Sequence, residues 1–254
     1  MKLEVNNEGD SYKLTAAVLI YTNNIHRHAF ATKHVVEEHA GRPIIRPGAP
    51  FTEKDYTGLV KALAPAEQPR MQWNDQRLLA RGLGRMMWWS PPMKRSLFFK
   101  KSPANAATFD GRGVCPCPGL IFMAAEQAMY VYAFKGAGAP TPETKLYQAP
   151  FFNVWSRGQV CVGNAVVPQE DRRDDPDAWE RMFFGSHFTH PNFTQKDRLI
   201  VGANPPQFWA GQLKKPSKQF PERVLFDLDL TVIDLLQIDY AQRLRAIATA
   251  QGEF

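Results

Sequence analysis

Cys161 and Asn153 are the residues whose types and spacing best suit chemistry. A cysteine thiolate is both a nucleophile and a leaving group, so Cys161 can accept an acyl group as a thioester and release it to an amine. A neutral amide donor such as Asn153 stabilises the negative charge that develops on the carbonyl oxygen, by about 2.7 to 4 kcal/mol when well placed. Gly158 permits a tight backbone path between them. The pattern therefore predicts an acyl-transfer site.

Both residues also have structural interpretations, which the sequence leaves open. A cysteine that follows Gln159 and Val160 in an apolar strand is commonly a buried small hydrophobic residue. An asparagine in a turn commonly bonds to the neighbouring backbone. Structure and catalysis can coincide at Asn153, so a defect on mutation would not by itself separate the two roles.

The residues around Cys161 resemble those of ubiquitin-conjugating enzymes. These enzymes place a His-Pro-Asn turn eight residues before the catalytic cysteine, a glycine three residues before it and a branched aliphatic residue directly before it. The chain matches that register at Asn153, Gly158, Val160 and Cys161. The wider run resembles the family of PRTRC system proteins B, classed as prokaryotic ubiquitin-conjugating-enzyme-like family D, over about residues 77 to 236. That run includes Tyr147, Pro150, Phe152, Pro168, Trp179, Glu180, Phe183, Phe184, Phe188, Thr189 and His190.

Two positions depart from the conjugating-enzyme pattern. Phe151 and Phe152 stand where the family has His and Pro, and Gly163 stands where an acidic residue is often found. We therefore carry over only Cys161 and Asn153 as catalytic residues, with no general acid or base, no cofactor and no metal.

The resemblance implies ubiquitin-like-protein-conjugating, acyl transferase activity in a bacterial PRTRC mobile-element cassette, on a plasmid or an integrated element. The implied partners are a ThiF-type activating enzyme, which would charge Cys161, and a ubiquitin-like modifier. The alternative is a non-catalytic protein- or DNA-binding module that retains the same fold. The departures at Phe151, Phe152 and Gly163 favour this alternative.

A basic stretch could serve that second function. The chain has a formal net charge of +6, and between residues 81 and 112 only Asp110 opposes seven basic residues. Such a surface attracts nucleic acid or an acidic protein partner, although a solvated strand face has the same composition. The basic residues are Arg81, Arg85, Lys94, Arg95, Lys100, Lys101 and Arg112.

Histidines and the other cysteines suggest weaker hypotheses. Cys115, Cys117, His187 and His190 could bind zinc, but one residue between two cysteine ligands is fewer than the usual two to four. Three cysteines cannot form a disulfide framework, so we expect reduced thiols. We expect the histidines near the N-terminus to lie on the surface; they are His26, His28, His34 and His39.

The elements that must position the site indicate an α+β fold. Residues 13–21 and 26–36 predict a β-hairpin, and Thr52 with Asp55 predicts a capped short helix that ends at Pro65. We assign this extension to residues 1–70. Four apolar segments predict an antiparallel four-stranded meander of the ubiquitin-conjugating type: 85–90, 94–99, 119–125 and 128–134. Helical patterns at 177–188 and 241–248 supply flanking and C-terminal helices of a domain spanning 71–254.

Composition excludes several classes of protein. No apolar run approaches the roughly 18 to 20 residues that span a bilayer, and the N-terminus has no apolar signal-peptide core, so we expect a cytoplasmic location without membrane contact. The chain has neither alternating βαβ units nor a glycine-rich phosphate motif, which argues against a dinucleotide or P-loop enzyme.

Overall fold

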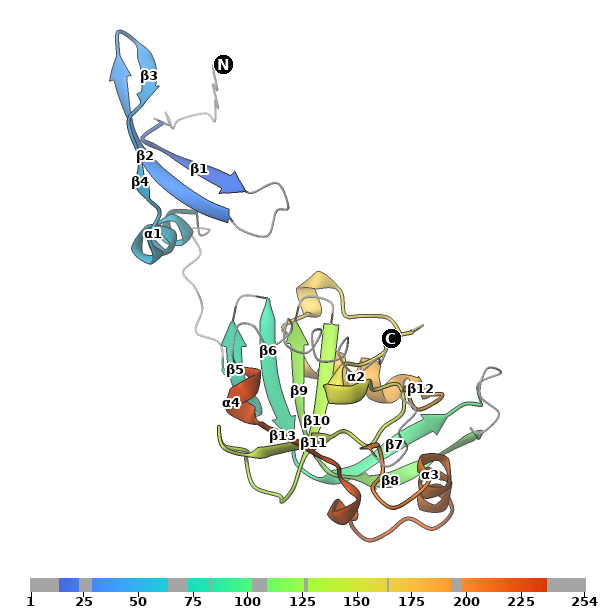
Figure 1. Ribbon diagram of the computed structural model, residues 1–254. Coiled ribbons are helices and arrows are strands. Elements are labelled where there is room, and N and C mark those ends of the chain that lie inside the picture. Colours follow the sequence, from blue (N-terminus) through green and yellow to red (C-terminus); the bar gives the residue numbers. More distant parts are fainter. Residues whose placement is uncertain are drawn as a thin grey trace. The chain divides into compact units, whose positions relative to one another are not determined.

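The computed structural model is a mixed α/β structure with mostly antiparallel sheets (Figure 1). It describes residues 14–22, 29–63, 73–82, 84–101, 109–125, 128–163, 165–192 and 198–236. The chain divides into two compact units, residues 1–73 and 74–254. None of the helices in these described ranges is long and apolar enough to span a membrane.

The N-terminal unit contains the predicted hairpin. Strand β1 (Ala16–Thr22) pairs antiparallel with β2 (Ala29–His39), and β2 also pairs with β3 (Arg42–Ile45) and β4 (Ala49–Pro50). The predicted turn between β1 and β2 lies outside the described residues.

Helix α1 (Glu53–Leu63) begins at the predicted capping box. The Asp55 backbone N–H donates to Thr52 Oγ1 at 3.3 Å, and the Thr52 N–H donates to the Asp55 carboxylate at 3.0 Å. These bonds satisfy two of the N–H groups that a helix start leaves without partners. The predicted stop at Pro65 lies outside the described residues.

The surface location predicted for His34 is wrong. Its imidazole is buried between Arg46 O, 2.8 Å from Nδ1, and Thr32 Oγ1, 2.7 Å from Nε2. Gly48 makes room for the ring, because a Cβ there would lie 2.4 Å from it. His39 is exposed as expected, and the two earlier histidines, His26 and His28, lie outside the described residues.

A six-stranded antiparallel sheet forms the centre of the second unit, in the order β13-β11-β10-β9-β6-β5 (Figure 1). Its strands are β5 (Leu78–Gly82), β6 (Arg85–Ser90), β9 (Gly119–Ala125), β10 (Ala128–Phe134), β11 (Lys145–Gln148) and β13 (Asp227–Thr231). A three-stranded sheet, β12-β7-β8, contains β7 (Met93–Phe99), β8 (Gly111–Cys117) and β12 (His187–Phe188).

The predicted meander is wrong at its second segment. Strand β7 does not lie between β6 and β9; it pairs with β8, a strand that the four predicted segments do not include. Ser90 pairs with Leu120 and Met93 pairs with Cys117. The pairing thus moves three residues forward on one strand and three residues back on the other, and the register does not change. Residues 85–99 and 111–125 are therefore one long bent hairpin. Prolines at 91, 92 and 118 interrupt the pairing at the bend, because proline has no N–H to donate.

Helix α2 (Pro176–Gly185) confirms the predicted helix, although its expected last residues form β12. Helix α3 (Pro205–Lys214) is not among the predicted elements. Asn204 Oδ1 caps α3 by accepting from Gln207 N–H at 3.2 Å, and Pro205 occupies the first turn, where no N–H is needed. Helix α4 (Val232–Leu235) follows β13. The predicted C-terminal helix at 241–248 lies outside the described residues.

Aromatic side chains fill the larger core of the second unit. Phe151 stacks on Trp209 with ring centroids 5.5 Å apart, and Phe152 meets Phe99 edge-on at 5.4 Å. The Trp209 Nε1–H donates to Pro150 O at 2.7 Å, which satisfies the buried indole. Phe151 and Phe152 therefore replace a polar motif with core packing.

Candidate functional site

A tight hairpin places Asn153 opposite Cys161. The Cys161 backbone N–H donates to Asn153 O at 2.7 Å, and Val154 and Val160 form the next antiparallel bridge. Short 3-10 turns at Ser156–Gly158 and Glu170–Arg172 lie within and after this segment. The eight-residue spacing seen in the sequence is thus the separation of two cross-strand neighbours.

The hairpin turn requires glycine at position 158. Gly158 has φ +97°, a region that L side chains rarely adopt, and its N–H donates to Trp155 O at 3.0 Å. A Cβ there would lie 2.6 Å from the Tyr132 ring and 2.9 Å from Val131 O. The tight path predicted from Gly158 is present.

Hydrogen bonds to the segment around β12 fix the Asn153 side chain. Asn153 Nδ2 donates to His187 O at 2.7 Å, while Oδ1 accepts from the Thr189 N–H at 3.1 Å and from Thr189 Oγ1 at 2.9 Å. The Asn153 N–H also donates to His190 O at 3.1 Å. The backbone-bonding role of Asn153 is therefore present. A carboxamide has two N–H groups, and the bond to His187 O uses one of them.

Cys161 is partly exposed and lines a cavity of about 890 Å³. Asn153 lines the same cavity, together with Lys100 directly after β7 and with residues from the segment after Cys161, from α2 and from β12 and the residues that follow it. The structure thus brings both predicted site residues to one solvent-reachable space. The polar and charged side chains around them belong to Lys100, Gln169, Arg172, Arg181, Ser186, His187, Thr189 and His190.

The cavity wall is cationic. Lys100, Arg172 and Arg181 line it, and none of the described residues around it carries a carboxylate. Asp175, the N-cap of α2, forms ion pairs with both arginines: its Oδ2 lies 2.8 Å from Arg172 Nη2 and 3.3 Å from Arg181 Nη2. Burial opposes ionisation of Asp175, but hydrogen bonds from Arg172 and from backbone N–H groups outweigh it and lower its pKa.

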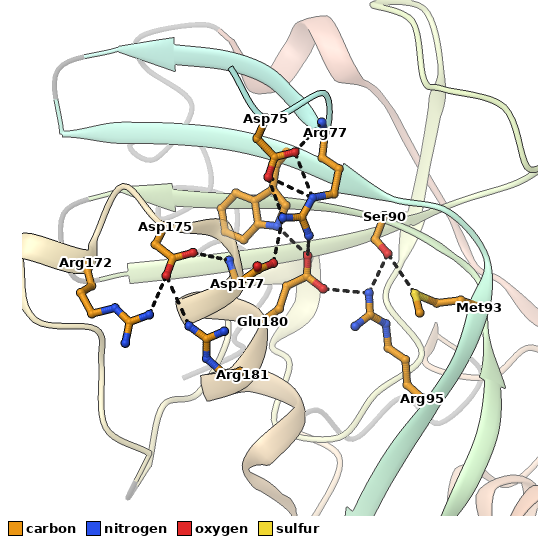
Figure 2. Close-up of polar contacts among 11 residues, drawn as sticks. Asp75, Arg77, Ser90, Met93, Arg95, Arg172, Asp175, Asp177, Glu180 and Arg181 are labelled. Carbon is orange, nitrogen blue, oxygen red and sulfur yellow. Dashed lines mark hydrogen bonds and ion pairs between the residues drawn. The ribbon is translucent and has the colours of Figure 1, made fainter. Parts of the chain in front are cut away.

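A buried ion network fastens α2, which supplies much of this wall (Figure 2). The Glu180 carboxylate accepts from Trp88 Nε1 at 3.1 Å and pairs with Arg95 at 2.8 Å and Arg77 at 3.3 Å. Arg77 also pairs with Asp75 at 2.6 Å. These bonds join α2 to β6, β7 and the segment before β5.

The proposed basic surface needs one correction. Arg95 does not lie on a solvated face: its side chain is mostly buried, pairs with Glu180 and stacks over the Phe184 ring at 4.2 Å. Lys100 faces the cavity, and the Arg81 guanidinium bonds to Asp174 O at 3.4 Å. The basic residues of this stretch therefore do not form one continuous solvated surface.

The four residues considered for zinc do not come together. Cys115 and Cys117 are buried in β8, whereas His187 and His190 line the cavity. Desolvation raises the pKa of Cys117 to about 12, which disfavours the thiolate that zinc requires. In the part of the chain that the structure describes, no three His, Cys, Asp or Glu side chains group as metal ligands.

Sequence reasoning missed the roles of Thr189 and Arg181 at this site. Thr189 lies 36 residues after Asn153, to which its hydroxyl binds, and no local motif signals that contact. In the sequence, the run Phe188-Thr189-His190 contributes only to the family resemblance, apart from His190 as a candidate zinc ligand. In the structure, the hydrogen bonds from Thr189 to Asn153 orient the Asn153 carboxamide.

Comparison with known proteins gives one family. The profile of a family described as prokaryotic E2 family D matches residues 55–228, which include most of α1, strands β5 to β12, the cavity and the Asn153–Cys161 hairpin. No curated protein and no solved structure matches the chain.

Proposed function

Because the chain belongs to prokaryotic E2 family D and is therefore a conjugating-enzyme-like protein, we propose that it carries a ubiquitin-like modifier as a thioester on Cys161. One observation carries the proposal: a partly exposed thiol and a fixed carboxamide lie on paired backbone segments at the wall of one cavity. The finer assignment, to the PRTRC system protein B family in a bacterial mobile-element cassette, is part of the same proposal.

The proposed cycle has two transfers. In the first, the Cys161 thiolate attacks the thioester of a charged ThiF-type activating enzyme, a new C–S bond forms and the enzyme's thiolate leaves. In the second, an acceptor amine attacks the Cys161 thioester, an amide forms and the Cys161 thiolate leaves. Asn153 uses its second Nδ2–H to stabilise the oxyanion of this step, where a single donor is worth about 2.7 to 4 kcal/mol.

A charging assay tests the proposal. The purified protein is incubated with its cassette's activating enzyme, ATP and modifier, and the products are separated with and without a thiol reductant. We expect an adduct that the reductant removes and that Cys161→Ala does not form. Cys117→Ala is the matched control, since that thiol is buried in β8, and it keeps the adduct.

A second candidate is a binding module that retains the fold. The cationic cavity wall and the aromatic core at Phe151 and Phe152 favour it, because neither feature supplies catalytic polar groups. The same assay separates the two functions. If the wild-type protein forms no adduct, while Cys161→Ala still binds an acidic protein partner or DNA, the binding module is correct and the carrier is not.

A further inference from the structure

The hydrogen bonds around Asn153 determine how its carboxamide is oriented. Nδ2 faces the carbonyl of His187, which can only accept, and Oδ1 faces the N–H of Thr189, which can only donate. The reverse orientation would set a donor against a donor and an acceptor against an acceptor. Oδ1 is therefore the acceptor for the Thr189 hydroxyl as well.

This orientation assigns the tautomer of His190. The Thr189 hydroxyl has one hydrogen and gives it to Asn153 Oδ1, so its oxygen can only accept from His190 Nδ1, which lies 2.9 Å away. Nδ1 consequently carries the proton in the neutral ring. Nε2 is left with its lone pair, as a proton acceptor on a ring that lines the Cys161 cavity.

We propose that His190 Nε2 is the general base that takes the proton from the acceptor amine when the Cys161 thioester is discharged, an inference that rests on the proposed function. The cavity wall has no carboxylate among its described residues, and its lysine and arginines are cationic at neutral pH. His187 is the other imidazole at the wall, and its ring lies edge-on to Phe98 at 6.4 Å, outside the hydrogen-bonded chain.

The step balances without a further reactant. The amine nitrogen forms a C–N bond to the thioester carbonyl, and one of its hydrogens passes to His190 Nε2 as a proton. The carbonyl oxygen re-forms its double bond, the C–S bond breaks, and the departing Cys161 thiolate recovers the proton from the His190 imidazolium. The products are an amide and the original thiol.

The hydrogen-bonded chain couples base and oxyanion donor. When His190 becomes a cation, its Nδ1–H is a stronger donor to Thr189, which in turn polarises the Asn153 carboxamide. The Nδ2–H of Asn153 then donates more strongly at the moment when negative charge develops on the carbonyl oxygen. Thr189 is therefore a positioning residue between the two.

A discharge assay with a defined probe tests the base. Acetylglycine 2-mercaptoethanesulfonate thioester loads Cys161 by thioester exchange, excess reagent is removed, and glycinamide is added while mass spectrometry follows the acylated protein. We expect His190→Ala to load normally and to discharge about 10² to 10⁴-fold more slowly, the usual contribution of a general base. Free imidazole should restore part of the rate in this variant.

Control variants and pH complete the assay. His39→Ala, on the N-terminal unit, keeps the parent rate, and His187→Ala loses far less than His190→Ala. The discharge rate depends on pH more weakly in His190→Ala than in the parent protein, because a general base acts only when it is unprotonated. The other titratable or charged side chains at the cavity are Lys100, Cys161, Arg172, Arg181 and His187, and each variant keeps them unless it removes one by design.

Nitrogen-15 NMR of the histidine rings gives a readout independent of activity. We expect a protonated Nδ1 and an unprotonated Nε2 in neutral His190, with a shift toward the other tautomer in Thr189→Val. An Nε2–H tautomer in the parent protein, or equal discharge by parent and His190→Ala, overturns the role of His190 alone. If Cys161 accepts no acyl group from the thioester, the carrier function fails and the His190 role fails with it.

Discussion

Replacing Gly158 with alanine should destabilise the hairpin that holds Cys161 opposite Asn153. The new Cβ would meet the Tyr132 ring at 2.6 Å and Val131 O at 2.9 Å, and the ring belongs to a fully buried side chain that cannot swing away. Overpacking of this kind costs about 1 to 3 kcal/mol, and a left-handed backbone adds about 1 to 2 kcal/mol for a residue with a Cβ. We expect Gly158→Ala to lower the free energy of unfolding by about 2 to 5 kcal/mol.

Gly163→Ala is the matched control for backbone strain. Gly163 also has a positive φ, +52°, but a Cβ there would meet nothing within 4 Å. Its substitution should therefore cost only the backbone term of about 1 to 2 kcal/mol. The two variants share the amino acid exchanged and differ in the contact with Tyr132.

Urea unfolding measures both free energies by linear extrapolation, and the labelling rate of Cys161 by a thiol reagent reports the hairpin directly. We expect a clearly larger loss of unfolding free energy for Gly158→Ala, and a changed Cys161 labelling rate in that variant alone. Equal losses in the two variants would show that the close approach to Tyr132 does not constrain the turn.

Three further outcomes follow from the ion network and the cysteines. Glu180→Ala leaves the mostly buried Arg95 guanidinium without its carboxylate partner and should lower the free energy of unfolding by about 3 to 5 kcal/mol, measured by urea unfolding. The hydrogen bond from Arg77 lowers the pKa of Asp75. The resulting stabilisation is present above the unfolded pKa of about 3.9 and is lost as pH falls through the lower folded pKa. In Asp75→Asn, the free energy of unfolding should therefore fall less steeply as the solution is acidified. Iodoacetamide at neutral pH should label Cys161 before Cys117, because burial raises the pKa of Cys117 to about 12, and peptide mapping that finds the reverse order contradicts the assignment of the exposed thiol.

Local signals in the sequence predicted the elements that depend on local chemistry. The capping box at Thr52, the N-terminal hairpin and helix α2 are present, because caps, alternation and helical periodicity act over a few residues. Helix α3 carries an equally local signal in Asn204 and Pro205, although the predicted elements do not include it.

Long-range pairing was beyond the sequence. The prolines at 91 and 92 separate two of the predicted strands, 85–90 and 94–99, which were expected to pair with each other. The chain instead continues through the bend, and residues 93–99 pair with 111–117. At the site, the spacing of Asn153 and Cys161 indicated that they would be close, since a hairpin is local. Thr189, His190 and Arg181 arrive from later elements, and their approach depends on tertiary packing that no spacing encodes.

Strand β12 links the β7–β8 part of the bent hairpin to Asn153, the cross-strand neighbour of Cys161. His187 and Phe188 pair in parallel with Phe98 and Phe99 of β7, and the same segment holds both ends of the Asn153 carboxamide. A protein that binds β7 and β8 with higher affinity in one arrangement of this segment would increase the population of that arrangement. By thermodynamic reciprocity, a ligand that binds in the cavity and favours the same arrangement would then raise the affinity for that protein by the same factor.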